Sequence, residues 1–415
     1  MRDVVVIGAG LAGLAATLRL SEAGAKVTLV TKGIGGLQLG QGTVDILGYA
    51  PERTEKPLAG LDEYIRKHPK HPYRHFTAQE ICKSAQWYAN ILGSDMLMGT
   101  PERNVFLPTA VGALRPTALY PPSMHAGTML DRPIAVVGLR RLKDFPATLI
   151  ADNLCAQKDH NGHPITARAL WIDVEIRHGE VDTNGVNHAR FLDTEEGRRS
   201  FVDALQPLLR EGEIVALPAI LGLNNPHVWQ CMQEMLGHDI CEIPVQPPSV
   251  PGMRMNQKMT ELVKKKSRLM TGTAVISSAS HGDSLTSVTV NTAGRQRVIE
   301  ARSFLIAAGG FESGALELDS YMQLKDTILD LPVWAPDEPL LHGDFWGPDQ
   351  PLFLCGFDVD RSMRVLNEQG KPAYANVYAA GGNLCGATRW REKSGEGIAL
   401  ASALRAADSI LGSLS

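Results

Sequence analysis

Apolar and polar positions near the start of the chain follow the order strand, turn, helix, strand. Residues 4–7 are four consecutive apolar side chains, which is typical of a strand buried on both faces of a parallel sheet. Glycines at 8, 10 and 13 come next, and apolar residues then recur at helical spacing. Residues 26–30 predict a second strand. The pattern therefore predicts a β–α–β unit with a glycine-rich first turn.

This turn has the G-x-G-x-x-G spacing of a dinucleotide site. Gly8 permits a tight turn, Gly10 lets the backbone approach a pyrophosphate, and Gly13 lets the helix pack closely on the strand. The free N–H groups and the dipole at the helix N-terminus favour an anion there. We therefore expect these glycines, together with Leu11 and Ala12, to contact a nucleotide cofactor.

The end of the second predicted strand departs from the usual dinucleotide pattern. An Asp or Glu commonly stands there and binds a ribose hydroxyl, but this chain has Thr31 followed by Lys32. Thr31 can still hydrogen-bond a ribose, and Lys32 can pair with a phosphate. The sequence therefore leaves both FAD and FMN open as the cofactor.

Two later stretches show the same pattern, a short apolar strand that ends on small residues. A loose β-meander leads into the apolar stretch 304–307, and a second apolar strand covers 376–380 before a C-terminal helix. Small residues allow a backbone to pass close to a flavin. The positions expected to line the flavin here are Ala308, Gly309, Gly381, Gly382, Asn383, Gly397 and Ile398. The last two begin the helix, whose N-terminus would stabilise negative charge on the reduced ring.

The region that follows the second strand is unusually rich in glycine. Residues 33–48 hold six glycines, a density typical of a loop that covers a ligand rather than of a plain linker. Gly42 and Thr43 are its candidate flavin contacts.

These motifs predict an α/β fold, a Rossmann-like FAD/NAD(P)-binding domain with a large inserted α+β substrate domain. We assign the discontinuous flavin-binding domain to residues 1–48, 265–320 and 360–415, and the inserted substrate or cap domain to residues 49–264 and 321–359.

Composition narrows the class of protein. The chain has 415 residues and a net charge of -4, so nothing indicates nucleic-acid binding. No apolar run reaches the roughly 18 residues of a membrane span. The six cysteines form no C-x-x-C pair, which argues against an iron–sulfur cluster or a zinc ribbon, and we expect no metal site. Residues 68–75 contain three histidines between prolines and are interpreted as a solvated loop.

The chain resembles the B-subunit family of anaerobic glycerol-3-phosphate dehydrogenase over nearly its full length. The resemblance rests on the glycine turn, the variant Thr31-Lys32-Gly33, and the segments 41–47, 114–119, 136–145 and 305–314. The glycine motif is shared by many nucleotide-binding proteins, whereas the Thr31 variant and the segment 41–47 are more specific.

This resemblance implies oxidation of sn-glycerol 3-phosphate to dihydroxyacetone phosphate, with electrons passed to quinone. It also implies a larger flavin subunit and an iron–sulfur subunit that attaches to the membrane as partners. Members of the family that this chain resembles are associated with FMN. We therefore expect a cytoplasmic chain, peripheral to the inner face of the cell membrane through its partner subunits.

Oxidation of a secondary alcohol needs a base for the hydroxyl proton and a flavin that accepts two electrons. His125 and His342 are the candidate bases. The substrate phosphate needs Arg or Lys, and the candidates are Arg115, Arg389, Arg391 and Lys393, with Arg391 also counted among the catalytic residues.

Two other functions stay open. The chain could be an electron-transfer or scaffold subunit whose flavin relays electrons without its own substrate chemistry. It could also be a dehydrogenase of the fumarate-reductase type.

Overall fold

The computed structural model describes residues 1–344 and 346–414 and divides the chain into two compact units. The first unit consists of Met1–Gly36, Asp45–Tyr88 and Met259–Ser415, and the second of Leu37–Val44 and Ala89–Lys258. These boundaries differ from the expected ones, because residues 49–88 and 321–359 group with the first unit and residues 37–44 with the second. Backbone contacts explain the difference, since Phe357, for example, forms a parallel bridge with Leu384.

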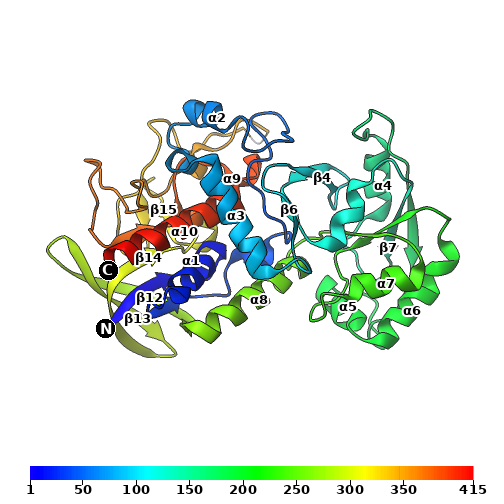
Figure 1. Cartoon of the computed structure of the whole chain (residues 1–415), viewed down its shortest axis with the longest axis horizontal. Coiled ribbons are helices and arrows are strands. Elements are labelled where there is room, and N and C mark those ends of the chain that lie inside the picture. Colours follow the sequence, from blue (N-terminus) through cyan, green and yellow to red (C-terminus); the bar gives the residue numbers. More distant parts are fainter. Residues whose placement is uncertain (345, 415) are drawn as a thin grey trace. The chain divides into compact units, whose positions relative to one another are not determined.

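A seven-stranded sheet organises the first unit (Figure 1). Its parallel strands, in spatial order, are β11 (Arg268–Met270), β2 (Val27–Val30), β1 (Arg2–Ile7), β14 (Arg295–Ile306) and β17 (Val377–Ala379). The long β14 continues outward and pairs with β13 (Ser284–Thr292), which pairs antiparallel with β12 (Thr273–His281). The predicted β-meander and the strands around the glycine motifs are thus confirmed.

Two helices of the first unit pack against each other over this sheet (Figure 1). They are α1 (Leu11–Glu22) and α10 (Gly395–Leu414), and an ion pair of 2.9 Å joins Arg19 of α1 to Asp408 of α10. Helix α10 has the length and apolar composition of a membrane span, and 56% of its apolar window is buried. That burial and its contact with α1 identify it as a core helix of this unit.

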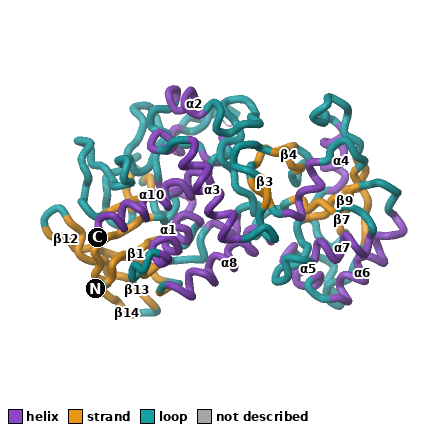
Figure 2. Tube along the Cα trace, in the orientation of Figure 1, coloured by secondary structure: helices purple, strands orange, loops and turns teal. Residues whose placement is uncertain are grey.

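Shorter elements and long loops complete the first unit (Figure 2). Helix α2 (Leu61–Lys67), the 3₁₀ turn η2 (Pro72–His75) and most of helix α3 (Ala78–Leu92) precede the second unit. Between β14 and β17 the remaining elements are the 3₁₀ turns η5 (Phe311–Ser313) and η6 (Pro351–Leu354) and the strands β15 (Leu316–Leu318) and β16 (Leu324–Asp326). The turn η7 (Gly381–Asn383) and the short helix α9 (Arg389–Glu392) lead from β17 to α10.

The second unit is built on a separate four-stranded parallel sheet. Its order is β10 (Ile240–Ile243), β9 (Ile214–Pro218), β7 (Ile134–Leu139) and β8 (Ala167–Ile172). Helices of this unit are α4 (Ala147–Cys155), α5 (Gly185–Leu192), α6 (Glu195–Leu205), α7 (Val228–Leu236) and part of α8 (Val250–Lys266). Two hairpin-like pairs, β3 (Met98–Gly99) with β6 (Leu119–Tyr120) and β4 (Val105–Pro108) with β5 (Leu114–Thr117), lie in the same unit.

A buried ion pair fixes α8 to the sheet of the second unit. Glu242 is fully buried and accepts both terminal nitrogens of Arg254, at 2.9 and 3.0 Å. It also accepts the Ser123 hydroxyl at 2.6 Å and the Leu221 backbone N–H at 2.7 Å. Burial raises the pKa of this carboxyl, but Arg254 and the other donors hold it below its ordinary value. The carboxylate is therefore ionised, and hydrogen bonds from protein groups replace those from water.

We predict that Arg254→Met destabilises the protein by about 3–5 kcal/mol, because it leaves the buried Glu242 carboxylate without its counter-ion. Chemical denaturation followed by circular dichroism measures the change. The matched control is Arg199→Met, which removes an exposed pair with Glu195 on α6 and is expected to cost less than about 1 kcal/mol. Equal effects of the two substitutions would contradict the role given to the buried pair.

Candidate flavin site

The three small-residue motifs meet at one edge of the sheet of the first unit. Strands β1, β14 and β17 are parallel neighbours, and Ile7, Ile306 and Ala379 are aligned across them at their carboxyl ends. The glycine turn, the stretch after β14 and the stretch after β17 therefore leave the sheet side by side. Ligands of open α/β sheets bind at this edge.

The glycines are required by close backbone approaches. Gly8 has a φ of 106°, and a Cβ there would lie 2.3 Å from the Ala307 carbonyl oxygen. A Cβ on Gly13 would lie 1.9 Å from the Gly8 carbonyl oxygen. A Cβ on Gly381 would lie 2.8 Å from the Ala12 Cβ. A larger residue at Gly8 or Gly381 would push neighbouring segments apart, and one at Gly13 would separate α1 from its own glycine turn.

Gly10 has a different environment. Its backbone is extended, with a φ of -74°, and a Cβ added there would meet no described atom within 4 Å. Gly10 is also the N-cap of α1, and within the described part of the chain no side chain caps that helix end. The helix thus presents unsatisfied N–H groups and its positive dipole end toward open space. Both features fit the pyrophosphate of a dinucleotide.

Asn383 supplies a second sign of a ligand. Its side chain is completely buried, and its amide nitrogen donates to the Ile306 carbonyl at 3.0 Å. Its side-chain oxygen has no hydrogen-bond partner among the described residues. An unsatisfied buried acceptor costs free energy, and a donor on a bound cofactor would satisfy it. The residues at this edge therefore fit a bound flavin.

The end of β2 offers no carboxylate to a ribose. The Thr31 hydroxyl donates to the Gly33 carbonyl at 2.6 Å, and its backbone pairs with Met270 and Thr273. Lys32 is exposed. Thr31 can therefore accept but not donate a further hydrogen bond while this geometry holds.

Most of the other expected cofactor contacts belong to the first unit, and two belong to the second. Gly309 lies 3.4 Å from the Cβ position of Gly382, and Gly397 lies in the first turn of α10 with its N–H bonded to the Asp45 carbonyl at 2.9 Å. Ala308 lies two residues after the end of β14, and Leu11 and Ile398 lie in the first turns of α1 and α10. Gly42 and Thr43 belong to the second unit, where Thr43 accepts two hydrogen bonds of 3.2 Å from Arg115.

The two candidate bases have different surroundings. His342 is engaged at both ring nitrogens, with Nε2 2.7 Å from the Pro348 carbonyl and Nδ1 3.3 Å from the Gln350 amide nitrogen. His125 belongs to the second unit and is exposed. Its Nδ1 lies 3.1 Å from the Tyr120 hydroxyl, and its ring stacks on that of Tyr120.

Two arginines of α9 point to different partners. Arg389 donates to the Gly382 carbonyl at 2.5 Å and lies 3.3 Å from Glu312, and its side chain is 23% exposed. Burial lowers the pKa of its guanidinium, an effect that Glu312 and Glu392 oppose. Arg391 is 59% exposed and pairs with Asp349 at 2.6 Å. Arg389 is therefore the arginine that contacts the glycine edge.

Sequence reasoning missed a buried polar cluster beside α9. The interpretation of residues 68–75 as a solvated loop is wrong at its centre, because His71 and Tyr73 are completely buried. His71 lies 3.1 Å from the carboxylate of Glu392, which is 4% exposed. No local pattern marks these residues, since their partner lies about 320 positions away; only the alternation of proline and histidine sets the stretch apart.

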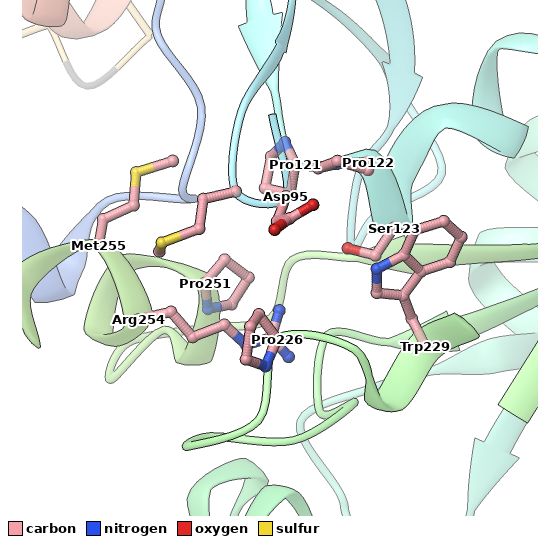
Figure 3. A pocket seen from close by; sticks show the side chains of 10 residues that line it. Asp95, Pro121, Pro122, Ser123, Pro226, Trp229, Pro251, Arg254 and Met255 are labelled. Atoms are coloured by element: carbon pink, nitrogen blue, oxygen red, sulfur yellow. The ribbon is translucent and has the colours of Figure 1, made fainter. Parts of the chain in front are cut away.

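The second unit contains a separate narrow cavity, shown in Figure 3. Its volume of about 20 Å³ has room for little more than one water molecule. Four prolines, Trp229 and two methionines line it, and Asp95, Ser123 and Arg254 contribute its polar groups. Because Arg254 and Ser123 already bind Glu242, this cavity is a poor candidate for a substrate site.

Comparison with known proteins places this geometry in a class. Residues 3–398 match the model of the FAD binding domain family, and the chain belongs to that family of FAD-binding flavoproteins. The predicted α/β flavoprotein fold is thereby confirmed, and of the two flavins that the sequence left open the match supports FAD. The class is that of flavin-dependent oxidoreductases.

Individual relatives indicate a narrower family than the domain model does. A Yersinia pestis protein named as the B-subunit of anaerobic glycerol-3-phosphate dehydrogenase is 29% identical over 424 residues, covering 99% of this chain and 98% of its own. A protein of the same name from Actinobacillus pleuropneumoniae is 26% identical, with 99% of both chains covered. The family resemblance found in the sequence is thereby confirmed.

Solved structures of similar chains are more distant. The 3-ketosteroid delta1-dehydrogenase of Sterolibacterium denitrificans has 12% identity and a TM-score of 0.45, with 99% of both chains covered. The open conformation of a flavocytochrome c3 fumarate reductase has 11% identity and a TM-score of 0.44, covering 99% of this chain and 78% of that chain.

We predict that Gly10→Val weakens FAD binding at least tenfold without destabilising the flavin-free protein. The valine side chain would extend into the open space in front of α1 and exclude the pyrophosphate, and its Cβ would meet no described protein atom within 4 Å. Fluorescence titration of the flavin-free chain and its thermal unfolding measure the two effects.

Gly60→Val is the matched control, because Gly60 is also a helix N-cap with open space around it, on α2. Unchanged FAD affinity in Gly10→Val, or the same loss in both variants, would contradict the placement of the pyrophosphate.

Proposed function

We propose that this chain is the B-subunit of an anaerobic glycerol-3-phosphate dehydrogenase and takes part in oxidising sn-glycerol 3-phosphate to dihydroxyacetone phosphate. The observation that carries the proposal is the combination of a complete flavin edge with relatives of that name along nearly the full length of both chains. A bound flavin supplies the acceptor for the two electrons that leave the alcohol carbon.

Arg389 is the proposed phosphate-binding residue. It contacts the Gly382 carbonyl at the flavin edge and is mostly shielded from water, so its charge is screened less than that of a surface arginine. Guanidinium groups bind phosphate with charge-assisted hydrogen bonds. Arg391, Lys393 and Arg115 are secondary candidates, and Arg391 would first have to leave Asp349.

His125 is the candidate base whose ring keeps a nitrogen available. When its Nδ1–H donates to the Tyr120 oxygen, the Nε2 lone pair is available to accept the proton of a substrate hydroxyl. In His342, by contrast, Nε2–H donates to the Pro348 carbonyl, and the Nδ1 lone pair accepts from Gln350.

Further subunits follow from the proposal. The relatives are named as one subunit of a complex, and we propose a larger flavin subunit and an iron–sulfur subunit that anchors the complex to the membrane. Electrons would leave through these partners to quinone. The chain would then work on the cytoplasmic side of the membrane, held there by its partners.

A relay role is the second candidate function, favoured by the engaged ring nitrogens of His342 and by the exposure of His125 in the other unit. In that case this chain would bind flavin, and a partner subunit would bind the substrate. Anaerobic addition of glycerol 3-phosphate to the isolated, flavin-loaded chain separates the two functions. Bleaching of the visible flavin band supports catalysis by this chain, and a band that bleaches only when partner subunits are added supports the relay.

We predict that Arg389→Gln raises the KM for glycerol 3-phosphate by about 10–100-fold, as expected for loss of a charge-assisted hydrogen bond of about 1.5–3 kcal/mol. The preference for glycerol 3-phosphate over glycerol should fall by the same factor, because glycerol lacks the phosphate. Steady-state assays of the assembled complex measure both quantities.

Arg19→Gln is the control for that assay, since Arg19 forms an exposed ion pair with Asp408 away from the glycine edge. If Arg389→Gln changes kcat but leaves the preference for the phosphate ester intact, Arg389 does not bind the phosphate.

A further inference from the structure

Glu392 is a buried carboxylate at the centre of a hydrogen-bonded cluster in the first unit. The cluster consists of Glu392, His71, Tyr64 and Ser394. One carboxylate oxygen accepts from His71 Nε2 at 3.1 Å and from the Ser394 hydroxyl at 2.6 Å, and the other accepts from the Tyr64 hydroxyl. Burial raises the pKa of this carboxyl, but these donors hold it below its ordinary value. The cluster therefore encloses a negative charge.

The state of His71 is defined by its backbone contact. Its Nδ1 accepts the backbone N–H of Tyr73 at 3.1 Å, so that nitrogen carries no proton. The ring proton must then reside on Nε2, which faces Glu392. His71 thus donates to Glu392 from Nε2 in an orientation that its backbone contact fixes.

The same cluster ties residues 45–49 to the start of α10. The Glu392 carbonyl accepts the backbone N–H groups of Gly48 at 2.8 Å and Tyr49 at 3.1 Å. The Tyr73 hydroxyl donates to the Ile46 carbonyl at 2.7 Å, and the Asp45 carbonyl accepts the Gly397 N–H at 2.9 Å. A Cβ on Gly397 would lie only 2.1 Å from the Tyr73 oxygen, so the first turn of α10 is held against this segment.

A strained residue lies between Glu392 and Ser394 of the cluster, just before α10. Lys393 has a φ of 54°, a left-handed conformation that a side chain other than glycine adopts rarely. Such conformations persist where the surrounding contacts fix the backbone on both sides. Here Glu392 is fixed by its carboxylate and carbonyl, and Ser394 by its hydroxyl bond to Glu392 and by the Ile398 N–H, which bonds its carbonyl at 2.9 Å.

Arg389 connects the cluster to the flavin edge. It begins the same short helix that Glu392 ends, and it donates to the Gly382 carbonyl. Glu392 also acts on it through space, since this carboxylate opposes the loss of charge that burial imposes on the guanidinium. A shift of Glu392 would therefore change both the position of Arg389 and the charge near it.

We propose that Glu392, oriented by His71 and Tyr64, is the positioning residue of the flavin site. Its carboxylate, through Ser394 and the backbone of α9, fixes the positions of Arg389 and the first turn of α10, and its negative charge opposes the additional charge of a reduced flavin. The proposal rests on the proposed flavin function of this edge, and it goes beyond that function by naming a residue that sets the redox preference of the site.

The experiment compares Glu392→Gln with wild type in the full-length, FAD-loaded chain. The substitution keeps the shape and one acceptor oxygen but removes the charge. We expect the affinity for reduced flavin relative to oxidised flavin to rise about tenfold, which corresponds to a midpoint potential about 30 mV more positive for a two-electron couple. Spectroelectrochemical titration measures the potential, and thermal unfolding measures stability separately.

Tyr64→Phe and Glu63→Gln accompany this variant. Tyr64→Phe removes one donor but leaves the charge, so it should loosen FAD binding with a potential shift smaller than that of Glu392→Gln. Glu63 lies on α2, as Tyr64 does, and forms an exposed ion pair with Lys67. Glu63→Gln replaces its carboxylate by an amide and should change neither the FAD affinity nor the midpoint potential.

The outcomes separate the two claims. If the Glu392→Gln chain stays folded with an unchanged potential, Glu392 has only a structural role and the inference is wrong, whether or not wild type oxidises glycerol 3-phosphate. If the Glu392→Gln chain loses flavin because it unfolds, the test is repeated with His71→Gln. That substitution keeps the carboxylate charge of Glu392 but alters its orientation. A change in the FAD affinity of the His71→Gln chain, without loss of stability of the flavin-free chain, supports the proposal. Unchanged FAD affinity and unchanged potential in that chain overturn the proposal. A shifted potential in a wild-type chain that is inert to glycerol 3-phosphate removes the proposed function and leaves the positioning role intact.

Discussion

Parallel pairing of β1, β14 and β17 is the constraint on which the rest of the first unit depends. It brings three segments that start about 300 and 70 residues apart to one edge, with Ile7, Ile306 and Ala379 in register. The segments can leave that edge together only because glycines stand where backbones meet. Gly8, whose Cβ would lie 2.3 Å from the Ala307 carbonyl oxygen, makes the tightest of these contacts between segments. Burial of continuous apolar strands then makes this arrangement stable.

The same edge leaves two polar features without a protein partner in the described part of the chain. They are the uncapped N-terminus of α1 at Gly10 and the buried side-chain oxygen of Asn383. Without a ligand the buried Asn383 oxygen costs free energy, whereas the open N-terminus of α1 is left to water. A dinucleotide flavin compensates both, and this physical argument agrees with the FAD-binding family to which the chain belongs.

Much of this fold could be predicted from the sequence because its signals are local. The glycine spacing, the apolar strands and the meander each lie within about 30 residues, and all were located correctly. The compact units and the cluster around Glu392 could not be predicted in the same way. His71 and Glu392 come into contact only when residues 45–88 pack with the C-terminal segment. The residues next to them in the sequence form no apolar pattern that would predict their burial. For the same reason the proline-rich stretch 68–75 looked solvated, although it carries buried donors.

The central claim is that the glycine edge binds a dinucleotide flavin through its pyrophosphate. The most direct test is an equilibrium titration of the flavin-free chain with FAD and, separately, with FMN, which lacks the pyrophosphate. The account predicts one FAD per chain and an affinity for FAD well above that for FMN, because α1 contributes its N-terminus only to the dinucleotide. Equal affinity for the two flavins, or binding of neither, would contradict it.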